Sequence, residues 1–195
     1  ITNPHLLENI SKVQTDLISR HESLERHVEA ASKAHVTLAV LHLSKEAVED
    51  CKAALSSFKP SYTEQDRTVN FTGLGLFSKR VVFAKPSSNI EFLKNLRAEV
   101  LSTLISGNIA VLEADREFNP HVTLFKIGRE RKRRKSKEDK SKNKLDIEEE
   151  RDIYSEYNFG DQLFDEMELL SMNKAKAAEA TEGRQGEGGM RWQVG

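Results

Sequence analysis

The tetrapeptide His-Val-Thr-Leu occurs twice, at residues 35–38 and 121–124. Each copy lies in a run rich in Val, Leu and Thr that predicts a β-strand, at residues 34–43 and 118–127. Side chains alternate between the two faces of a strand, so each copy presents an imidazole and a hydroxyl on one face and Val with Leu on the other. The 86 residues that separate the copies place one in each half of the chain, as an internal duplication would. The fold must therefore accommodate two matching strands.

Chance does not easily explain this repetition. Six His and nine Thr in 195 residues give roughly 0.3 expected His-x-Thr triplets, the background against which a short motif is judged. Both triplets also lie within apolar strand patterns. We therefore interpret His35 with Thr37, and His121 with Thr123, as two halves of one functional site, against the alternative of histidines that only complete their strands.

Helical and strand patterns alternate along the rest of the chain, which predicts an α/β or α+β domain. Asn3 followed by Pro4 is typical of a helix start, Ser44 caps a second helix, and Cys51 falls on the apolar stripe of that helix, where it predicts a core residue rather than a nucleophile. The expected helices cover residues 4–20, 45–59, 89–105 and 160–165, and the expected strands cover 34–43, 68–72, 80–85, 118–127 and 167–172, with a glycine-permitted bend at 73–75.

The cysteine content and the apolar runs limit the class of protein. One cysteine cannot form an intrachain disulfide, and no Cys/His array has zinc-ligand spacing, which favours a reduced compartment and no bound metal. No apolar run approaches the roughly 18 residues of a membrane span. We expect a monomer in the cytoplasm, the nucleus or both. Since the chain begins at Ile1, we also expect a fragment whose first strand precedes that residue.

The charges are unevenly distributed. Residues 129–144 contain ten Lys and Arg against three Asp and Glu, a local charge of +7, so the rest of a chain with net charge −1 carries −8. We expect one domain at residues 1–173, a disordered basic insert at 129–151, and a disordered tail at 174–195. The basic run of the insert fits a nuclear-import signal or an RNA contact, or else a solvated loop; its residues are Arg131, Lys132, Arg133, Arg134 and Lys135.

Four segments together resemble a known family. They are A-H-V-T-L-A-V-L-H-L (34–43), V-N-F-T-G-L-G-L-F-S-K-R-V-V-F-A-K (69–85), F-N-P-H-V-T-L-F-K-I (118–127) and Y-S-E-Y-N-F-G-D-Q-L-F-D-E-M-E-L-L-S-M (154–172). The pattern is similar to the 2H phosphoesterase superfamily, which includes bacterial RNA ligase/cyclic phosphodiesterase proteins, and within it to the central domain of an A-kinase anchoring protein. The resemblance implies a bilobal fold in which two antiparallel sheets form a cleft and helices cover the outside.

The resemblance also implies a reaction. His35 and His121 would act as general acid and base on a phosphodiester without a metal or another cofactor, and Thr37 and Thr123 would hold the phosphate. The implied substrates are a nucleotide or short RNA with a 2',5'-linked oligoadenylate or 2',3'-cyclic phosphate linkage. The kinase-binding helix of anchoring proteins is not visible in the chain, so we do not infer kinase anchoring.

Two further residues are weaker candidates for binding the substrate. Phe77 follows the predicted bend and could stack on a nucleobase, or could simply anchor the loop. Arg80 could neutralise phosphate if its side chain faces the site. The alternatives to an enzyme are a module that binds nucleoside monophosphates without turnover and, from the basic run alone, an RNA-tethering scaffold.

Overall fold

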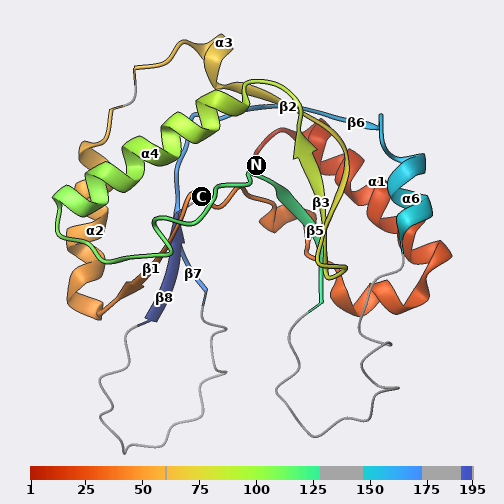
Figure 1. Ribbon diagram of the computed structural model, residues 1–195, viewed down its shortest axis with the longest axis horizontal. Helices are drawn as coiled ribbons and strands as arrows, with labels where there is room; N and C mark the ends of the chain where they lie inside the picture. Colours follow the sequence, from red (N-terminus) through yellow and green to blue (C-terminus); the bar gives the residue numbers. More distant parts are fainter. Residues whose placement is uncertain (60, 128–146, 173–189, 195) are drawn as a thin grey trace, which may run out of the picture. The chain divides into compact units, whose positions relative to one another are not determined.

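The structure, a computed structural model, describes residues 1–59, 61–127, 147–172 and 190–194 (Figure 1). The contacts divide the chain into two compact units: unit 1 comprises Ile1–Val36, Glu64–Ile90 and Pro120–Phe164, and unit 2 comprises Thr37–Thr63, Glu91–Asn119 and Asp165–Gly195. Each unit has its own four-stranded antiparallel sheet and its own helices. The predicted mixed class with two antiparallel sheets is confirmed.

Unit 1 has the sheet order β5-β3-β2-β6. Its helices and strands are α1 (Pro4–Arg20), the 3₁₀ helices η1 (Glu22–His27) and η2 (Ala31–Lys33), α3 (Glu64–Arg67), β2 (Thr68–Phe77), β3 (Val81–Pro86), β5 (Val122–Lys126), α6 (Glu148–Ile153) and β6 (Asn158–Leu163). The prediction of a helix at residues 160–165 is wrong, because Asn158–Leu163 pairs with β2 as a strand.

The hairpin of β2 and β3 differs from the prediction of a bend at residues 73–75. β2 is continuous through both glycines, and the register shifts between Phe71 and Leu74. Gly73 has a φ of +79° within this bulge, a conformation that an L side chain rarely adopts. The chain reverses instead at residues 78–80, where Arg80 N donates to the Phe77 carbonyl at 2.9 Å. The glycines therefore bend a strand and do not end it.

Helix α1 covers one face of the unit 1 sheet. The Asn3 side chain caps its start by accepting from His5 N at 2.9 Å. Asn9 Nδ2 donates to the Phe159 carbonyl of β6 at 3.0 Å, and Gln14 Nε2 donates to the Leu124 carbonyl of β5 at 3.0 Å. The helix is therefore bound to both outer strands, and its fully buried apolar residues, Leu6, Ile10, Val13 and Leu17, fill the space beneath.

Unit 2 contains β1 (Ala39–Leu43), α2 (Lys45–Ser57), α4 (Ile90–Ser106), β4 (Val111–Leu112), β7 (Leu169–Ser171) and β8 (Met190–Val194). The sheet order is β4-β1-β8-β7. The Ser44 hydroxyl caps α2 as predicted. The core between sheet and helices is formed by buried apolar residues that include Leu41, Leu43, Cys51, Val100, Leu104 and Val194.

Two predictions of disorder are wrong where the structure describes the chain. Residues 190–194 form β8, which pairs with β1 and β7. The sequence M-R-W-Q-V alternates apolar and polar residues, but such a short strand is stabilised by partners that are distant in sequence. The end of the basic insert is also ordered, since Ile147 is 1% exposed and α6 follows it. The rest of the insert and residues 173–189 lie outside the described residues.

Candidate functional site

The second His-Val-Thr-Leu copy lies at the start of β5. Val122 and Leu124 are fully buried, and Thr123 is half-buried within the strand. His121 directly precedes the strand and is also half-buried. The burial alternates as the sequence predicts, so the imidazole and the hydroxyl share the less buried side.

Strand register shows which side of the unit 1 sheet carries the side chains of His121 and Thr123. Phe71 pairs with Gly160, and the position of a Cβ at Gly160 faces Leu6 of α1, so Phe71 lies on the helix side. Alternation along the paired strands places Phe83, which pairs with Thr123 and with Gly75, on the opposite side. We call this side the His121 face; its residues include Gly75, Phe77, Phe83, Lys85, His121 and Thr123.

Two phenylalanine rings surround the imidazole on this face. Phe77 stacks on Phe83 with ring centroids 4.0 Å apart, and His121 meets Phe77 at 5.0 Å and Phe83 at 5.2 Å in edge-on geometry. A Cβ at Gly75 would collide with the Phe83 ring, so the absence of a side chain there makes room for this ring. The ring contacts fix the plane of the His121 imidazole.

The first copy has a different setting. Residues 35–38 form an irregular segment before β1, so the predicted strand is shorter than expected. Val36 and Leu38 are nevertheless 2% and 5% exposed, and the alternation persists without a strand ladder. His35 Nδ1 lies 2.8 Å from the Lys33 carbonyl. A carbonyl oxygen can only accept, so Nδ1 carries a proton, and Nε2 holds the lone pair when the ring is neutral.

The structure brings some predicted site residues together and separates others. His121, Thr123 and Phe77 share the His121 face, and the Phe77 ring contacts the His121 imidazole. His35 belongs to the same unit, whereas Thr37 begins unit 2. Arg80 lies in the turn after β2, and its guanidinium makes no hydrogen bond or ion pair with any residue that the structure describes.

Sequence reasoning missed Phe83 and Gly75 as parts of this site. Their contact with His121 depends on the pairing of β3 with β2 and β5, which links positions far apart in sequence. One signal in the sequence could have identified them. A glycine within a strand often allows another group to approach closely, and two glycines precede the strand that contains this phenylalanine.

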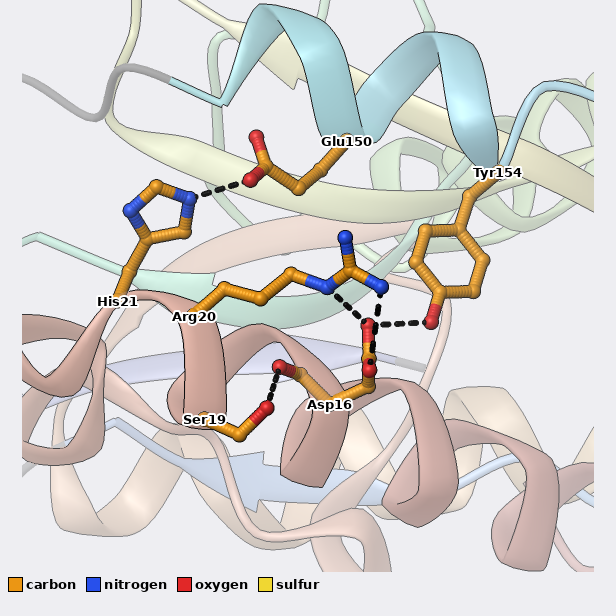
Figure 2. A network of polar contacts seen from close by, with 6 residues as sticks. All are labelled: Asp16, Ser19, Arg20, His21, Glu150 and Tyr154. Atoms are coloured by element: carbon orange, nitrogen blue, oxygen red, sulfur yellow. Dashed lines mark hydrogen bonds and ion pairs between the residues drawn. The ribbon is translucent and has the colours of Figure 1, made fainter.

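A second polar cluster lies elsewhere in unit 1 and joins α1 to α6 (Figure 2). His21 Nε2 lies 2.5 Å from Glu150 Oε1, and the Tyr154 hydroxyl donates to Asp16 Oδ2 at 2.7 Å. Arg20 completes the cluster through its ion pair with Asp16. The pairing of His21 with Glu150 was not predicted because Glu150 follows two other glutamates. The sequence does not show which of these acidic side chains contacts α1.

The pKa shifts in this cluster follow from burial and from its hydrogen bonds. Burial tends to raise the pKa of Glu150, but the hydrogen bond from His21, a backbone hydrogen bond and the positive charges of His21 and Arg20 together outweigh burial, and the pKa is lowered. The hydrogen bonds from Tyr154 and then Arg20 lower the pKa of Asp16. Burial, with the Asp16 carboxylate, raises the pKa of Tyr154 to about 12. The cluster therefore holds its charges in fixed pairs, which is typical of a structural contact.

Other candidate chemistry is limited within the part of the chain that the structure describes. No three His, Cys, Asp or Glu residues among residues 1–59, 61–127, 147–172 and 190–194 lie close enough to hold a metal ion. Cys51 is fully buried, as predicted, and burial raises the pKa of its thiol, which disfavours the thiolate. Among the described helices, none has the length and apolar character needed to cross a bilayer.

Comparisons with known proteins place these features in context. The family model described as "AKAP7 2'5' RNA ligase-like domain" matches residues 1–180, which include both His-x-Thr motifs, and this confirms the predicted family resemblance. Among solved structures, the crystal structure of E. coli LigT complexed with 3'-AMP is similar, with 22% identity and a TM-score of 0.47 over 62% of this chain and 67% of that chain. The search of curated proteins found no significant match.

Proposed function

The chain belongs to the AKAP7 2'5' RNA ligase-like domain family, and from this premise we propose that it is a 2H-type phosphodiesterase acting on nucleotide or oligonucleotide phosphodiesters. The proposed linkages are 2',5'-linked oligoadenylate or 2',3'-cyclic phosphate. The observation that carries the proposal is the His121 face, where an imidazole and a hydroxyl project beside two aromatic rings from a strand whose motif occurs twice in the chain.

We assign the roles of the two histidines from the hydrogen bond of the His35 imidazole. His35 donates through Nδ1 to the Lys33 carbonyl, so its neutral ring can accept a proton at Nε2 as a general base. In hydrolysis, His35 takes a proton from water as the water oxygen bonds to phosphorus. His121, in its protonated form, gives a proton to the leaving oxygen as the P–O bond breaks. Two imidazoles balance the protons of this step without a metal.

The threonines and the rings have supporting roles in the proposal. The Thr123 hydroxyl shares the His121 face and can donate to a non-bridging phosphate oxygen, where charge develops in the transition state. Thr37 follows His35 at the same spacing and is assigned the matching role. Phe83 already stacks on one face of Phe77, so a nucleobase would extend this stack rather than begin one.

The proposal is tested by incubating the purified protein with 2',5'-linked, 3',5'-linked and 2',3'-cyclic nucleotides in excess chelator. We expect hydrolysis of the 2',5'-linked or the cyclic substrates, with the products identified by chromatography. Nucleotide binding without turnover on any of these substrates would instead favour the nucleotide-binding module. Activity that chelator abolishes and zinc, magnesium or manganese restores would contradict the metal-independent reaction.

We also propose a role for the basic run at residues 131–135. Its five consecutive Lys and Arg residues are typical of a nuclear-import signal and can also contact RNA phosphates. The proposed location is therefore the cytoplasm, the nucleus or both. The import role is tested by imaging a tagged chain and a tagged variant in which these five residues are changed to Gln. The nuclear signal of the tag should be lower in the variant than in the parent.

A further inference from the structure

Lys85 is a charged residue of the His121 face that the proposed reaction leaves unused. It lies two residues after Phe83 on β3, and alternation therefore projects both side chains from the same side of the sheet. Its side chain is exposed, and it forms no ion pair with any residue that the structure describes.

The backbone beside Lys85 is shaped to receive its side chain. A Cβ at Gly73 would collide with the Ser155 carbonyl oxygen and would lie 2.9 Å from Lys85 Cε and 3.1 Å from Lys85 Nζ, so the Ser155 backbone and the end of the lysine side chain share the space that a side chain at Gly73 would need. The positive φ of Gly73 and the hydrogen bond from Gly73 N to the Tyr157 carbonyl, at 2.9 Å, hold the bulge in this form. The ammonium group therefore lies over β2.

This position separates Lys85 from the group that would hold the scissile phosphate. Thr123 is on β5, and the sheet order β5-β3-β2 places β2 two strands away, which is about 10 Å at the usual spacing of strands. One phosphate group cannot contact both residues. Phe83, on the middle strand, lies between them, with Phe77 stacked on its ring.

We infer that Lys85 binds a second phosphate, so that the site prefers a nucleoside with phosphates on both sides, as in an oligonucleotide or a 5'-phosphorylated dinucleotide. This inference rests on the proposed function and names its substrate class. A lysine ammonium forms charge-assisted hydrogen bonds with phosphate oxygens. A cyclic mononucleotide has only one phosphate and would not use Lys85.

The test compares the binding of adenosine 3',5'-bisphosphate and of 3'-AMP by calorimetric titration, in the parent, K85Q, K85R and K126Q. Lys126 provides a matched control because it is an exposed lysine of the same sheet, at the far end of β5. We expect K85Q to weaken bisphosphate binding by about tenfold and to leave 3'-AMP binding unchanged. K85R should restore bisphosphate binding, and K126Q should bind both nucleotides as the parent does.

Three outcomes would overturn the inference. The first is that K85Q binds the bisphosphate as tightly as the parent does. The second is that K85Q weakens the binding of both nucleotides equally. The third is that K126Q weakens bisphosphate binding as much as K85Q does, which would indicate a general effect of charge. A parent that binds neither nucleotide and hydrolyses no substrate would contradict the proposed function itself, and this result is distinguishable because it appears before any lysine is changed. Circular dichroism of each variant confirms that it is folded.

Discussion

The two His-Val-Thr-Leu copies have the same sequence and different structural support. His35 is held by the backbone, through its hydrogen bond to the Lys33 carbonyl, in a segment that is not a strand. His121 is held by the rings of Phe77 and Phe83 at the start of β5. The buried Val and Leu are common to both copies and set the direction in which the His and Thr project.

This difference shows what a repeated motif determines and what it does not. The buried pair orients the polar pair in both copies, but the contacts of each ring decide which nitrogen carries a proton and how the ring is oriented. An acid–base pair needs such an asymmetry, because one ring must be neutral while the other is protonated. Substitutions in each copy can therefore show whether the two copies are equally necessary and differently supported.

The largest effect is expected from removing either imidazole. His35→Ala and His121→Ala should each lower turnover by about a hundredfold or more, and the double variant should be little worse than either single one, because the two residues act as a unit. Steady-state kinetics on a 2',5'-linked dinucleotide measures this. His42→Ala, at an exposed histidine of β1, is the matched control and should retain activity. Full activity in a folded single variant would contradict the pairing of the copies.

A smaller effect, confined to the second copy, is expected for Gly75→Ala. The added methyl group would collide with Phe83 and displace the ring that contacts His121. We expect a loss of about 1–3 kcal/mol in the free energy of unfolding and an activity about tenfold lower, from the misplaced imidazole. Gly107→Ala is the control, because a Cβ there meets its nearest neighbour, Ala54, at 3.4 Å. Unchanged activity in folded Gly75→Ala would mean that the rings do not position His121.

His21 provides a contrast with both copies, since its pairing with Glu150 is structural. The pKa of Glu150 is lowered in the folded chain, so its contribution to stability is present above the ordinary carboxyl pKa of 4.5 and is lost as the pH falls through the folded value. We expect Glu150→Gln to cost up to about 1 kcal/mol at neutral pH and to flatten the fall in stability below pH 5, with turnover unchanged.

Denaturant titrations at several pH values measure this effect. Glu149→Gln, at an exposed position of the same helix, is the control and should leave the curve unchanged. If Glu150→Gln lowered turnover as strongly as the loss of His121, the α1–α6 cluster would belong to the catalytic site, and the distinction between structural and functional histidines would fail.

The smallest effect on catalysis is expected from the basic run. Changing residues 131–135 to Gln should leave hydrolysis of a dinucleotide nearly unchanged, because phosphate contacts by such a run add affinity for long polyanions without reading bases. Binding to longer RNA should become weaker and less dependent on salt, as filter binding over a salt series would measure. A large loss of dinucleotide hydrolysis would instead assign the run to the site.

Local sequence signals predicted the parts of the fold that are stabilised locally. Asn3 and Ser44 cap helices where expected, and the alternation around His121 gave the correct faces. Gly73 was interpreted as a bend because a glycine within a bulge has the same local signature as a glycine in a turn. Residues 158–163 and 190–194 were missed as strands because their partners, β2 and β1, are distant in sequence.

The same reasoning explains what could be predicted of the site. The His-x-Thr pairs could be proposed as site residues because they form an evident repeat, and Phe77 because it follows two glycines in the sequence. Phe83, Gly75 and Lys85 come to the His121 face only through the register of three strands. A repeat can be recognised from one sequence, but strand register depends on packing that a single sequence does not encode locally.

The pH dependence of turnover in excess chelator tests the central claim most directly, when it is measured for the parent, His35→Ala and His121→Ala. The parent should give a bell-shaped profile, because one ring must be neutral while the other is protonated. His35→Ala should lose the acidic limb and His121→Ala the alkaline limb of the residual activity. Both limbs persisting in both variants would contradict an acid–base pair formed by the two copies.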